Sequence, residues 1–253
     1  MIQFRDLHKS FGSKRVLSGL DLEIRTGETL VVIGQSGSGK SVLLKLLIGI
    51  LAPDRGSIVI DGTDVASMDR ETRQKTARKF GMLFQAAALF DSLNVGENVA
   101  FGLKRRTDLD PAAIGKIVAD SLAKVGLSGI EDLMPYELSG GMRKRVGLAR
   151  AIAYRPEIIL YDEPSTGLDP IRADAINDLI LLLQKEMGVT SIVITHDLVS
   201  AYKVADRMAM LYDGRIVAVG TPTKSGNRPT LWSNSFSSGE RTVQSRIGSG
   251  GIR

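Results

Sequence analysis

Short apolar segments recur along the chain, separated by polar or amphipathic segments. Five of them have the length of a strand buried in a sheet. They are residues 29–33, 57–60, 81–84, 158–161 and 191–195. A further strand is predicted around Leu20, Leu22 and Ile24, which alternate with polar neighbours as in a half-buried strand. Residues 29–33 and 158–161 are apolar throughout, which predicts burial on both faces.

Helical segments lie between these strands. Residues 42–48 predict a helix packed on the sheet, residues 173–187 predict another, and residues 94–153 are helical in pattern with no convincing strand. This alternation predicts an α/β fold with a mainly parallel sheet, into which a helical block is inserted. The Asp213-Gly214 pair, flanked by apolar segments 208–212 and 215–219, predicts an antiparallel portion: a hairpin with a type I′ turn.

The predicted organisation is one domain over residues 1–220, followed by a tail. Its core comprises residues 1–85 and 155–220, and a helical subdomain at residues 86–154 interrupts the core. Residues 221–253 contain seven serines and five glycines but few large apolar side chains. Such a segment buries too little apolar surface to offset its ordering entropy, so we expect it to be mostly disordered. A divergent tail and a changed reading frame both explain its composition.

Composition and charge exclude several classes of protein. The net charge is +5, but residues 221–253 hold five basic residues and one acidic residue, whereas the other 220 residues hold 28 basic and 27 acidic ones. The body is therefore nearly neutral, and a nucleic-acid partner is not expected. The lack of cysteine excludes disulfides and thiolate metal sites. No apolar stretch approaches the roughly 18 residues that a membrane span needs, and the N-terminus does not resemble a signal peptide.

The strongest chemical signal is a glycine-rich segment between a predicted strand and a predicted helix. It fits the pattern G-x-x-x-x-G-K-[ST], and its residues are Gly34, Gln35, Ser36, Gly37, Ser38, Gly39, Lys40 and Ser41. Glycines let successive N–H groups point at phosphate oxygens, and the helix start adds positive potential. Lys40 is expected to contact the β- and γ-phosphates and Ser41 to ligate Mg²⁺. The alternative is an ordinary Gly/Ser turn with a surface lysine.

A second signal lies at the end of the apolar strand 158–161, where Asp162 and Glu163 follow. Ligands of open α/β sheets bind at the carboxyl ends of strands. Asp162 is expected to hold Mg²⁺, and Glu163 to polarise the attacking water or to act as its base. The alternative is a strand that ends in a polar turn, because Asp-Glu-Pro is good turn chemistry.

A third signal is the sequence Leu138-Ser139-Gly140-Gly141-Met142, which precedes a predicted helix. Ser139 is a good N-cap, yet the first turn contains three basic residues, Arg143, Lys144 and Arg145. Each is unfavourable there by roughly 0.3–1 kcal/mol, because the helix N-terminus is already positive. Two explanations stay open: a solvated basic face, or a helix start built to meet an anion.

The order and spacing of these three segments resemble those of ABC-type ATPases, over about residues 2–220. The resemblance implies a P-loop NTPase cassette that binds ATP and Mg²⁺ and works as a head-to-tail dimer of two copies. In that arrangement Ser139, Gly140 and Gly141 of one copy close the ATP site of the other.

The resemblance also implies roles for four further residues. Phe11 occupies the adenine-stacking position, where the family more often has Tyr; a core aromatic is the alternative. Gln85 matches the Q-loop, which touches Mg²⁺ and the attacking water, and Asp169 matches the D-loop, which acts across the dimer. His196, at the end of the strand 191–195, matches the histidine that contacts the γ-phosphate; a structural histidine is the alternative.

Within the family, the sequence is most similar to the ATPases of the Mla/MCE lipid-transport systems. The similarity lies in residues 84–95, 134–146 and 161–171, and Met142 stands where many relatives have Gln. This branch implies phospholipid transport, powered from the cytoplasmic face of the inner membrane through separate permease subunits and an MCE-type lipid-binding subunit. An ABC transporter ATPase for another small solute is the alternative. A soluble ABC-type ATPase of DNA repair or translation is less favoured, because neither long coiled coils nor a second cassette are present. The tail from Thr223 does not match the branch.

Overall fold

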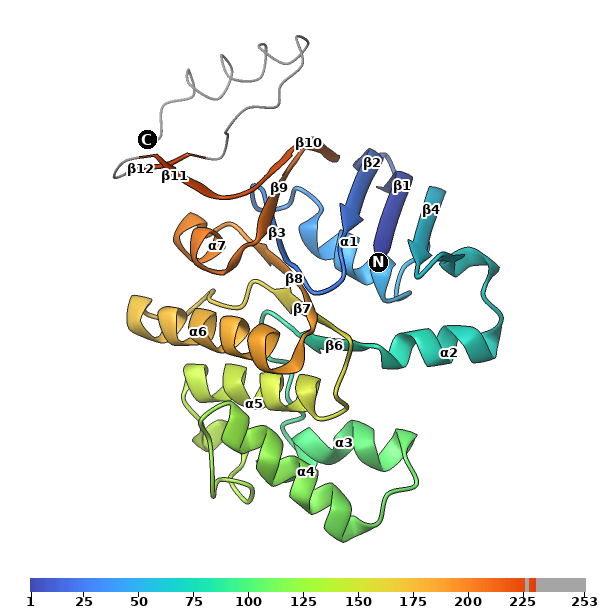
Figure 1. The fold of residues 1–253 in the computed structure, drawn as a ribbon. Helices are drawn as coiled ribbons and strands as arrows, with labels where there is room; N and C mark the ends of the chain where they lie inside the picture. The colour runs from blue at the N-terminus through green and yellow to red at the C-terminus, as the bar shows by residue number, and fades with distance from the viewer. Residues whose placement is uncertain (226–227, 231–253) are drawn as a thin grey trace.

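The computed structural model describes residues 1–225 and 228–230, and it contains two main sheets with helices around them (Figure 1). The larger sheet has the strand order β10-β9-β3-β8-β7-β6. Its strands are β3 (Thr29–Ile33), β6 (Phe80–Leu83), β7 (Ile158–Asp162), β8 (Thr190–Thr195), β9 (Arg207–Tyr212) and β10 (Arg215–Gly220). All neighbouring pairs are parallel except β9 and β10. Every residue of β3, β7 and β8 is buried, as a sheet covered on both faces requires.

The smaller sheet is antiparallel, with the order β2-β1-β4-β5. Its strands are β1 (Ile2–Phe11), β2 (Lys14–Ile24), β4 (Arg55–Ile60) and β5 (Thr63–Asp64). Helix α1 (Lys40–Leu47) shares one core with both sheets, because Phe4, Leu22, Leu43 and Leu160 belong to a single buried cluster. The helix that begins at the glycine-rich segment is thus fixed on both sides.

Helices occupy the chain between β6 and β7, and this part of the described chain contains no strand. Its elements are α3 (Val95–Arg106), α4 (Pro111–Lys124), the 3-10 turn η2 (Pro135–Glu137) and α5 (Gly140–Ile152). Asn94 and Glu97 form a capping box at the start of α3, and Asp110 caps α4 ahead of Pro111. Figure 1 shows these helices stacked away from the smaller sheet, with α5 nearest to α6 (Pro170–Met187).

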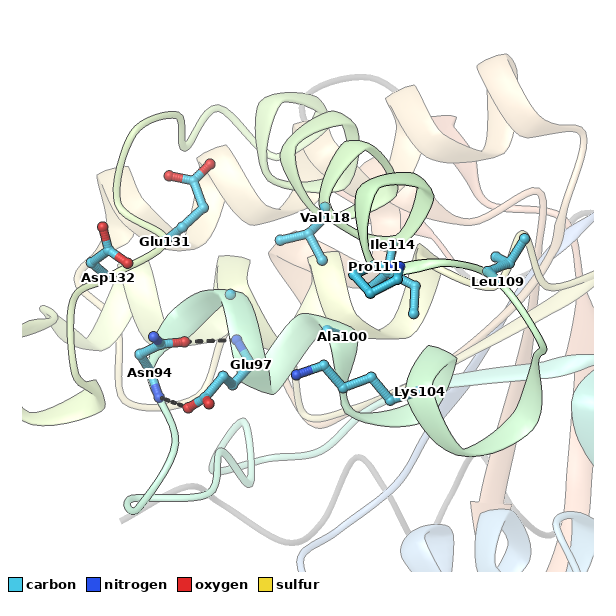
Figure 2. A pocket seen from close by; sticks show the side chains of 12 residues that line it. Asn94, Glu97, Ala100, Lys104, Leu109, Pro111, Ile114, Val118, Glu131 and Asp132 are labelled. Carbon is cyan, nitrogen blue, oxygen red and sulfur yellow. Dashed lines mark hydrogen bonds between the residues drawn. The ribbon is translucent and has the colours of Figure 1, made fainter.

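A hollow remains on the surface of this helical block, between α3 and α4 (Figure 2). Ala100, Ile114 and Val118 give it an apolar floor, and Lys104 and Glu131 lie at its rim. The remaining elements border the two sheets. They are η1 (Val65–Ser67), α2 (Arg70–Arg78) and α7 (Leu198–Val204).

Most of the predicted elements are confirmed, with shifts at their ends. The strand at residues 29–33 matches β3 in full, while β6 lies one residue before the predicted 81–84, and α1 begins at Lys40 rather than at residue 42. The hairpin is confirmed: Asp213 and Gly214 have φ of 47° and 72°, and a type I′ turn needs positive φ at both residues. The pattern did not predict β1, β5, α2 or α7.

Two short strands, β11 (Thr223–Ser225) and β12 (Arg228–Thr230), lie in the segment for which disorder is predicted. Residues 226–227 and 231–253 lie outside the described residues, so the prediction for them stays a prediction. The division of the domain at residues 86 and 154 likewise stays a prediction.

The membrane prediction concerns helix length and apolarity. Within residues 1–225 and 228–230, none of the helices is both long and apolar enough to span a bilayer.

Candidate nucleotide site

The glycine-rich segment forms the connection between β3 and α1. Gly37 and Gly39 have φ of 78° and 105°, a conformation that glycine adopts at little cost. Gly34 is also required for space, because a Cβ there would lie 2.5 Å from the carbonyl oxygen of Leu211. The backbone can therefore curl closely in front of the helix start.

Lys40 is folded back over this loop. Its side chain is only 6% exposed, and Nζ donates to the carbonyl oxygens of Gly34 at 2.7 Å and Gln35 at 3.0 Å. The same ammonium lies 3.6 Å from Glu163 Oε1. A buried lysine needs such partners, and an anion above the loop would offer it another.

Asp162 and Glu163 are both buried at the end of β7, next to the start of α1. Ser41 Oγ donates to Asp162 Oδ1 at 3.0 Å. Burial raises the pKa of the Asp162 carboxyl above its ordinary value; the Ser41 hydrogen bond opposes this and the neighbouring Glu163 charge adds to it. A cation would lower the cost of burying two adjacent carboxylates.

Glu163 is held by contacts on both its main chain and its side chain. Its N–H donates to the Ile194 carbonyl in β8 at 2.9 Å, and its φ is +49°. Thr166 Oγ1 donates to Glu163 Oε2 at 3.2 Å, and His196 Nδ1 lies 2.9 Å from the same oxygen. The structure thus brings His196, which directly follows β8, and Lys40 from α1 to one carboxylate.

The residues present fit ATP and Mg²⁺. Ser38 Oγ is buried in the loop without a hydrogen-bond partner among the described residues, so a ligand atom there would satisfy it. The Ser41 hydroxyl and the Asp162 carboxylate are oxygen donors of the kind that Mg²⁺ prefers. Within the described chain no group of three or more His, Cys, Asp or Glu could hold a metal.

Two further expected residues, Phe11 and Gln85, are exposed. Phe11 ends β1 and is 47% exposed, so the alternative that it is a core aromatic is wrong. Lys9 Nζ lies 5.6 Å from the centroid of its ring. Gln85 follows β6 and is exposed.

The other expected residues lie at two adjacent helix starts. Ser139 caps α5, as predicted: the Met142 N–H donates to its Oγ at 3.3 Å. Asp169 caps α6 in the same way, through the Arg172 N–H at 3.0 Å. Gly140 and Gly141 face the start of α6, since a Cβ on Gly141 would lie 3.5 Å from Arg172 Cδ. No hydrogen bond or ion pair of the described chain joins Ser139 or Asp169 to residues 34–41.

The basic residues at the start of α5 do not all form a solvated face, which was one of the two explanations of their sequence. Lys144 is 5% exposed and its Nζ donates to the carbonyl oxygen of Glu163 at 3.1 Å, so the solvated basic face is wrong for this residue. Arg143 Nη1 donates to the Leu138 carbonyl at 2.8 Å. Burial lowers the pKa of the Lys144 ammonium, while the charges of Asp162 and Glu163 act in the opposite direction. Arg143 and Lys144 therefore donate hydrogen bonds to carbonyl groups of their own chain.

Three residues near the site were missed by sequence reasoning: Lys144, Thr166 and Arg150. Arg150 donates to the carbonyl oxygens of Ala88 and Ala87, both at 2.7 Å. No local pattern signals the contacts of Lys144 and Arg150, because their partners are backbone carbonyls 19 and more than 60 residues away in the sequence.

Comparison with known proteins gives the class to which this fold and site belong. Residues 17–166 match the ABC transporter family, and the chain belongs to this family of ATP-binding cassettes. A solved dimeric ATP-binding cassette in a post-hydrolysis state, bound to ADP and Pi, superposes with a TM-score of 0.79 at 31% identity. The superposition covers 87% of this chain and 98% of that one.

Two curated relatives are similar over most of this chain. One is the probable ribonucleotide transport ATP-binding protein mkl of Mycobacterium tuberculosis, 46% identical over 219 residues. The alignment covers 87% of this chain but 61% of that protein, so the mycobacterial protein is longer. The other is the intermembrane phospholipid transport system ATP-binding protein MlaF of Escherichia coli, 39% identical over 221 residues, which cover 87% of this chain and 82% of that protein.

Proposed function

We propose that the chain hydrolyses ATP, which it binds together with Mg²⁺ at residues 34–41 and Asp162. The observation that carries this proposal is the convergence of Lys40, Ser41, Asp162 and Glu163 in one buried cluster. Lys40 contacts the β- and γ-phosphates, where its ammonium exchanges carbonyl partners for phosphate oxygens. Ser41 and Asp162 would hold Mg²⁺, with Gln85 as a further contact, and the bound ion would supply positive charge to the phosphates.

Glu163 orients and polarises the attacking water and accepts its proton. Its carboxylate is buried and already fixed from both sides, which suits a group that must meet a water in one orientation. His196 lies against Glu163 Oε2 and is half exposed, so its other nitrogen is free to contact the γ-phosphate. Phe11 stacks on the adenine.

The active unit is a head-to-tail dimer of two copies of this chain. Ser139, Gly140 and Gly141 lie at a capped helix start whose N–H groups favour an anion, and the same chain's loop does not supply one. The phosphates of the ATP bound to the second copy supply this anion. Asp169, beside these residues at the start of α6, acts across the same interface. The dimeric solved cassette bound to ADP and Pi supports this arrangement.

The work of this ATPase is transport of lipid, and of phospholipid in particular, through separate membrane subunits. The similarity to MlaF supports phospholipid as the cargo, whereas the name of mkl favours a ribonucleotide, the second candidate. The membrane permease docks in a hollow beside Gln85, which is lined by Ala86, Ala88, Leu89, Asp91, Pro135, Tyr136 and Arg143. Tyr136 is 79% exposed there and offers an aromatic contact. An MCE-type lipid-binding subunit completes the assembly on the outer side of the inner membrane, and this chain lies on its cytoplasmic face.

The Glu163→Gln variant tests the enzymatic part. We expect steady-state ATP hydrolysis to fall by about 100-fold or more, because a general base contributes that much. ATP binding should be unchanged, and gel filtration with Mg²⁺ and ATP should show a trapped dimer. Glu157→Gln is the matched control, since Glu157 is exposed before β7 and its carboxylate pairs with Lys79. Turnover at the normal rate in Glu163→Gln contradicts the proposal.

The cargo is tested on the native complex. We expect mild-detergent purification of the full chain to bring with it a permease and a single-span lipid-binding subunit, and mass spectrometry to find bound phospholipid. A complex with a solute-binding protein and no enriched lipid would support the other small solute, including a ribonucleotide.

A further inference from the structure

The contact between α5 and the end of β7 involves one buried side chain. Lys144 lies in the first turns of α5, and its Nζ donates to the carbonyl oxygen of Glu163 at 3.1 Å. Both residues are at least nine-tenths buried. A lysine is seldom buried to this extent without a specific partner, so the contact needs a reason.

The reason lies in the backbone of Glu163. Its φ of +49° falls in the left-handed region, which non-glycine residues avoid and which persists only when surrounding contacts over-determine it. The Glu163 N–H donates to the Ile194 carbonyl in β8, and the Glu163 carbonyl oxygen accepts from Lys144 Nζ at 3.1 Å and from the Thr166 N–H at 3.3 Å. These hydrogen bonds fix the peptide groups on either side of the Cα that bears the carboxylate, and Lys144 is the donor that comes from a distant helix.

The Lys144 contact is directed at the main chain rather than at the charge. Lys40 faces Glu163 Oε1, and His196 and Thr166 face Oε2, so the carboxylate already has its own partners. Lys144 belongs instead to the helix that Ser139 caps, five residues earlier in the chain. At 1.5 Å per residue, the helix connects Ser139 rigidly to Lys144 over about 7.5 Å.

We propose that Lys144 is a positioning residue: through the carbonyl of Glu163 it holds the left-handed turn that aims the carboxylate at the attacking water. This inference rests on the proposed role of Glu163. Lys144 touches neither nucleotide nor water itself. Its loss therefore slows hydrolysis without weakening ATP binding.

The test compares two substitutions in the full chain. Lys144→Met keeps the apolar stem as far as the ε position but removes the donor, and we expect kcat to fall about tenfold or more with KM within about twofold. Lys144→Gln restores a neutral N–H donor on a side chain one bond shorter, and we expect kcat about threefold below wild type. The affinity for a non-hydrolysable ATP analogue should be unchanged in both. Lys124→Met makes the same chemical change at an exposed lysine that pairs with Glu186, and should leave all three values unchanged.

Several results would overturn the inference. The inference fails if Lys144→Met has the kcat of wild type. It also fails if a lower affinity for the ATP analogue accounts for the whole loss of hydrolysis. A merely structural role would lower the thermal midpoint and the active fraction, and Lys144→Gln would recover nothing. If Lys144→Met shows no cooperative unfolding, Lys144→Gln decides alone: a lowered kcat at unchanged affinity supports the inference, and an unchanged kcat overturns it.

A parallel series separates this inference from the proposed function. If Glu163→Gln hydrolyses ATP normally, the role of Glu163 fails first. If Glu163→Gln loses hydrolysis while Lys144→Met does not, only the role of Lys144 fails. The double variant should be no slower than Glu163→Gln alone, because Lys144 acts only through Glu163.

Discussion

Two glycine-containing motifs stand before helix starts, and they differ in what surrounds them. Residues 34–41 lead into α1, where Lys40, Asp162 and Glu163 are buried. Lys40 lies against Glu163, and Ser41 donates to Asp162. Residues 138–142 lead into α5, where Ser139 is exposed and caps its own helix. Residues 34–41 thus have charged and hydroxyl side chains of their own chain around them, whereas Ser139 in residues 138–142 is exposed to solvent.

This difference separates binding from hydrolysis. The first motif has in one chain the cationic, acidic and hydroxyl groups that Mg²⁺·ATP needs, so we expect a single chain to bind nucleotide. The second offers N–H groups to an anion that its own chain does not hold. A change at the second motif should therefore leave binding intact and remove only the activity that needs two copies.

The largest expected effect comes from a charge at Ser139. Ser139→Asp keeps a good N-cap oxygen for the Met142 N–H, yet places a negative charge where the proposed dimer brings phosphates. We expect hydrolysis to fall by about 100-fold or more through repulsion in a poorly solvated interface. The affinity of the single chain for an ATP analogue, measured by fluorescence, should stay unchanged.

Ser139→Asn is the matched control for this charge. It caps the helix equally well without the charge. Hydrolysis should remain within about fivefold of wild type, since the backbone donors are retained. Equal rates for Ser139→Asp and Ser139→Asn would mean that no phosphate approaches this helix start.

A smaller effect is expected at the other end of α5, where Arg150 connects the helix to the turn after Gln85. The turn contains Ala87 and Ala88 with φ of 61° and 47°, an unfavourable conformation for alanine, and the guanidinium binds both carbonyls. We expect Arg150→Gln to lower the free energy of unfolding by about 2 kcal/mol, as for a lost charged hydrogen bond. Chemical denaturation measures this value.

The control for Arg150 is Arg78→Gln, at an exposed position in the last turn of α2. It should change stability by less than about 0.5 kcal/mol, as surface substitutions do. If both variants unfold alike, Arg150 does not stabilise the turn.

The sequence predicted what depends on local pattern. The apolar run 29–33 and the Asp213-Gly214 turn have the structures that their own residues favour. The motif at residues 34–41 is contiguous, so its residue types alone predict phosphate binding. Asp162 and Glu163 could be proposed from the sequence because they stand at the end of a predicted buried strand.

What could not be predicted depends on contacts between distant segments. Strand β1 mixes polar and apolar residues and contains register shifts, so its pairing with β2 and β4 decides its structure. Lys144 and Arg150 have the appearance of surface residues in a basic helix, and only the position of α5 beside Glu163 and the Gln85 turn gives them partners. The left-handed backbone of Glu163 likewise has contacts from β8 and α5, at Ile194 and Lys144, that its neighbours in the chain do not reveal.

The smallest expected effect has the opposite sign and concerns the buried motif. Asp162 and Glu163 lie side by side at 7% and 8% exposure, a costly arrangement before a cation arrives. Asp162→Asn keeps the oxygen that accepts from Ser41 and removes one charge. We therefore expect the nucleotide-free chain to gain about 1 kcal/mol, or roughly 2–4 °C in thermal midpoint. Stabilisation by Mg²⁺ with ATP should be lost, because the variant lacks the carboxylate that binds the ion in wild type. A lower midpoint for the empty variant would show that Asp162 stabilises the fold itself, and that burial of the two carboxylates serves structure more than metal binding.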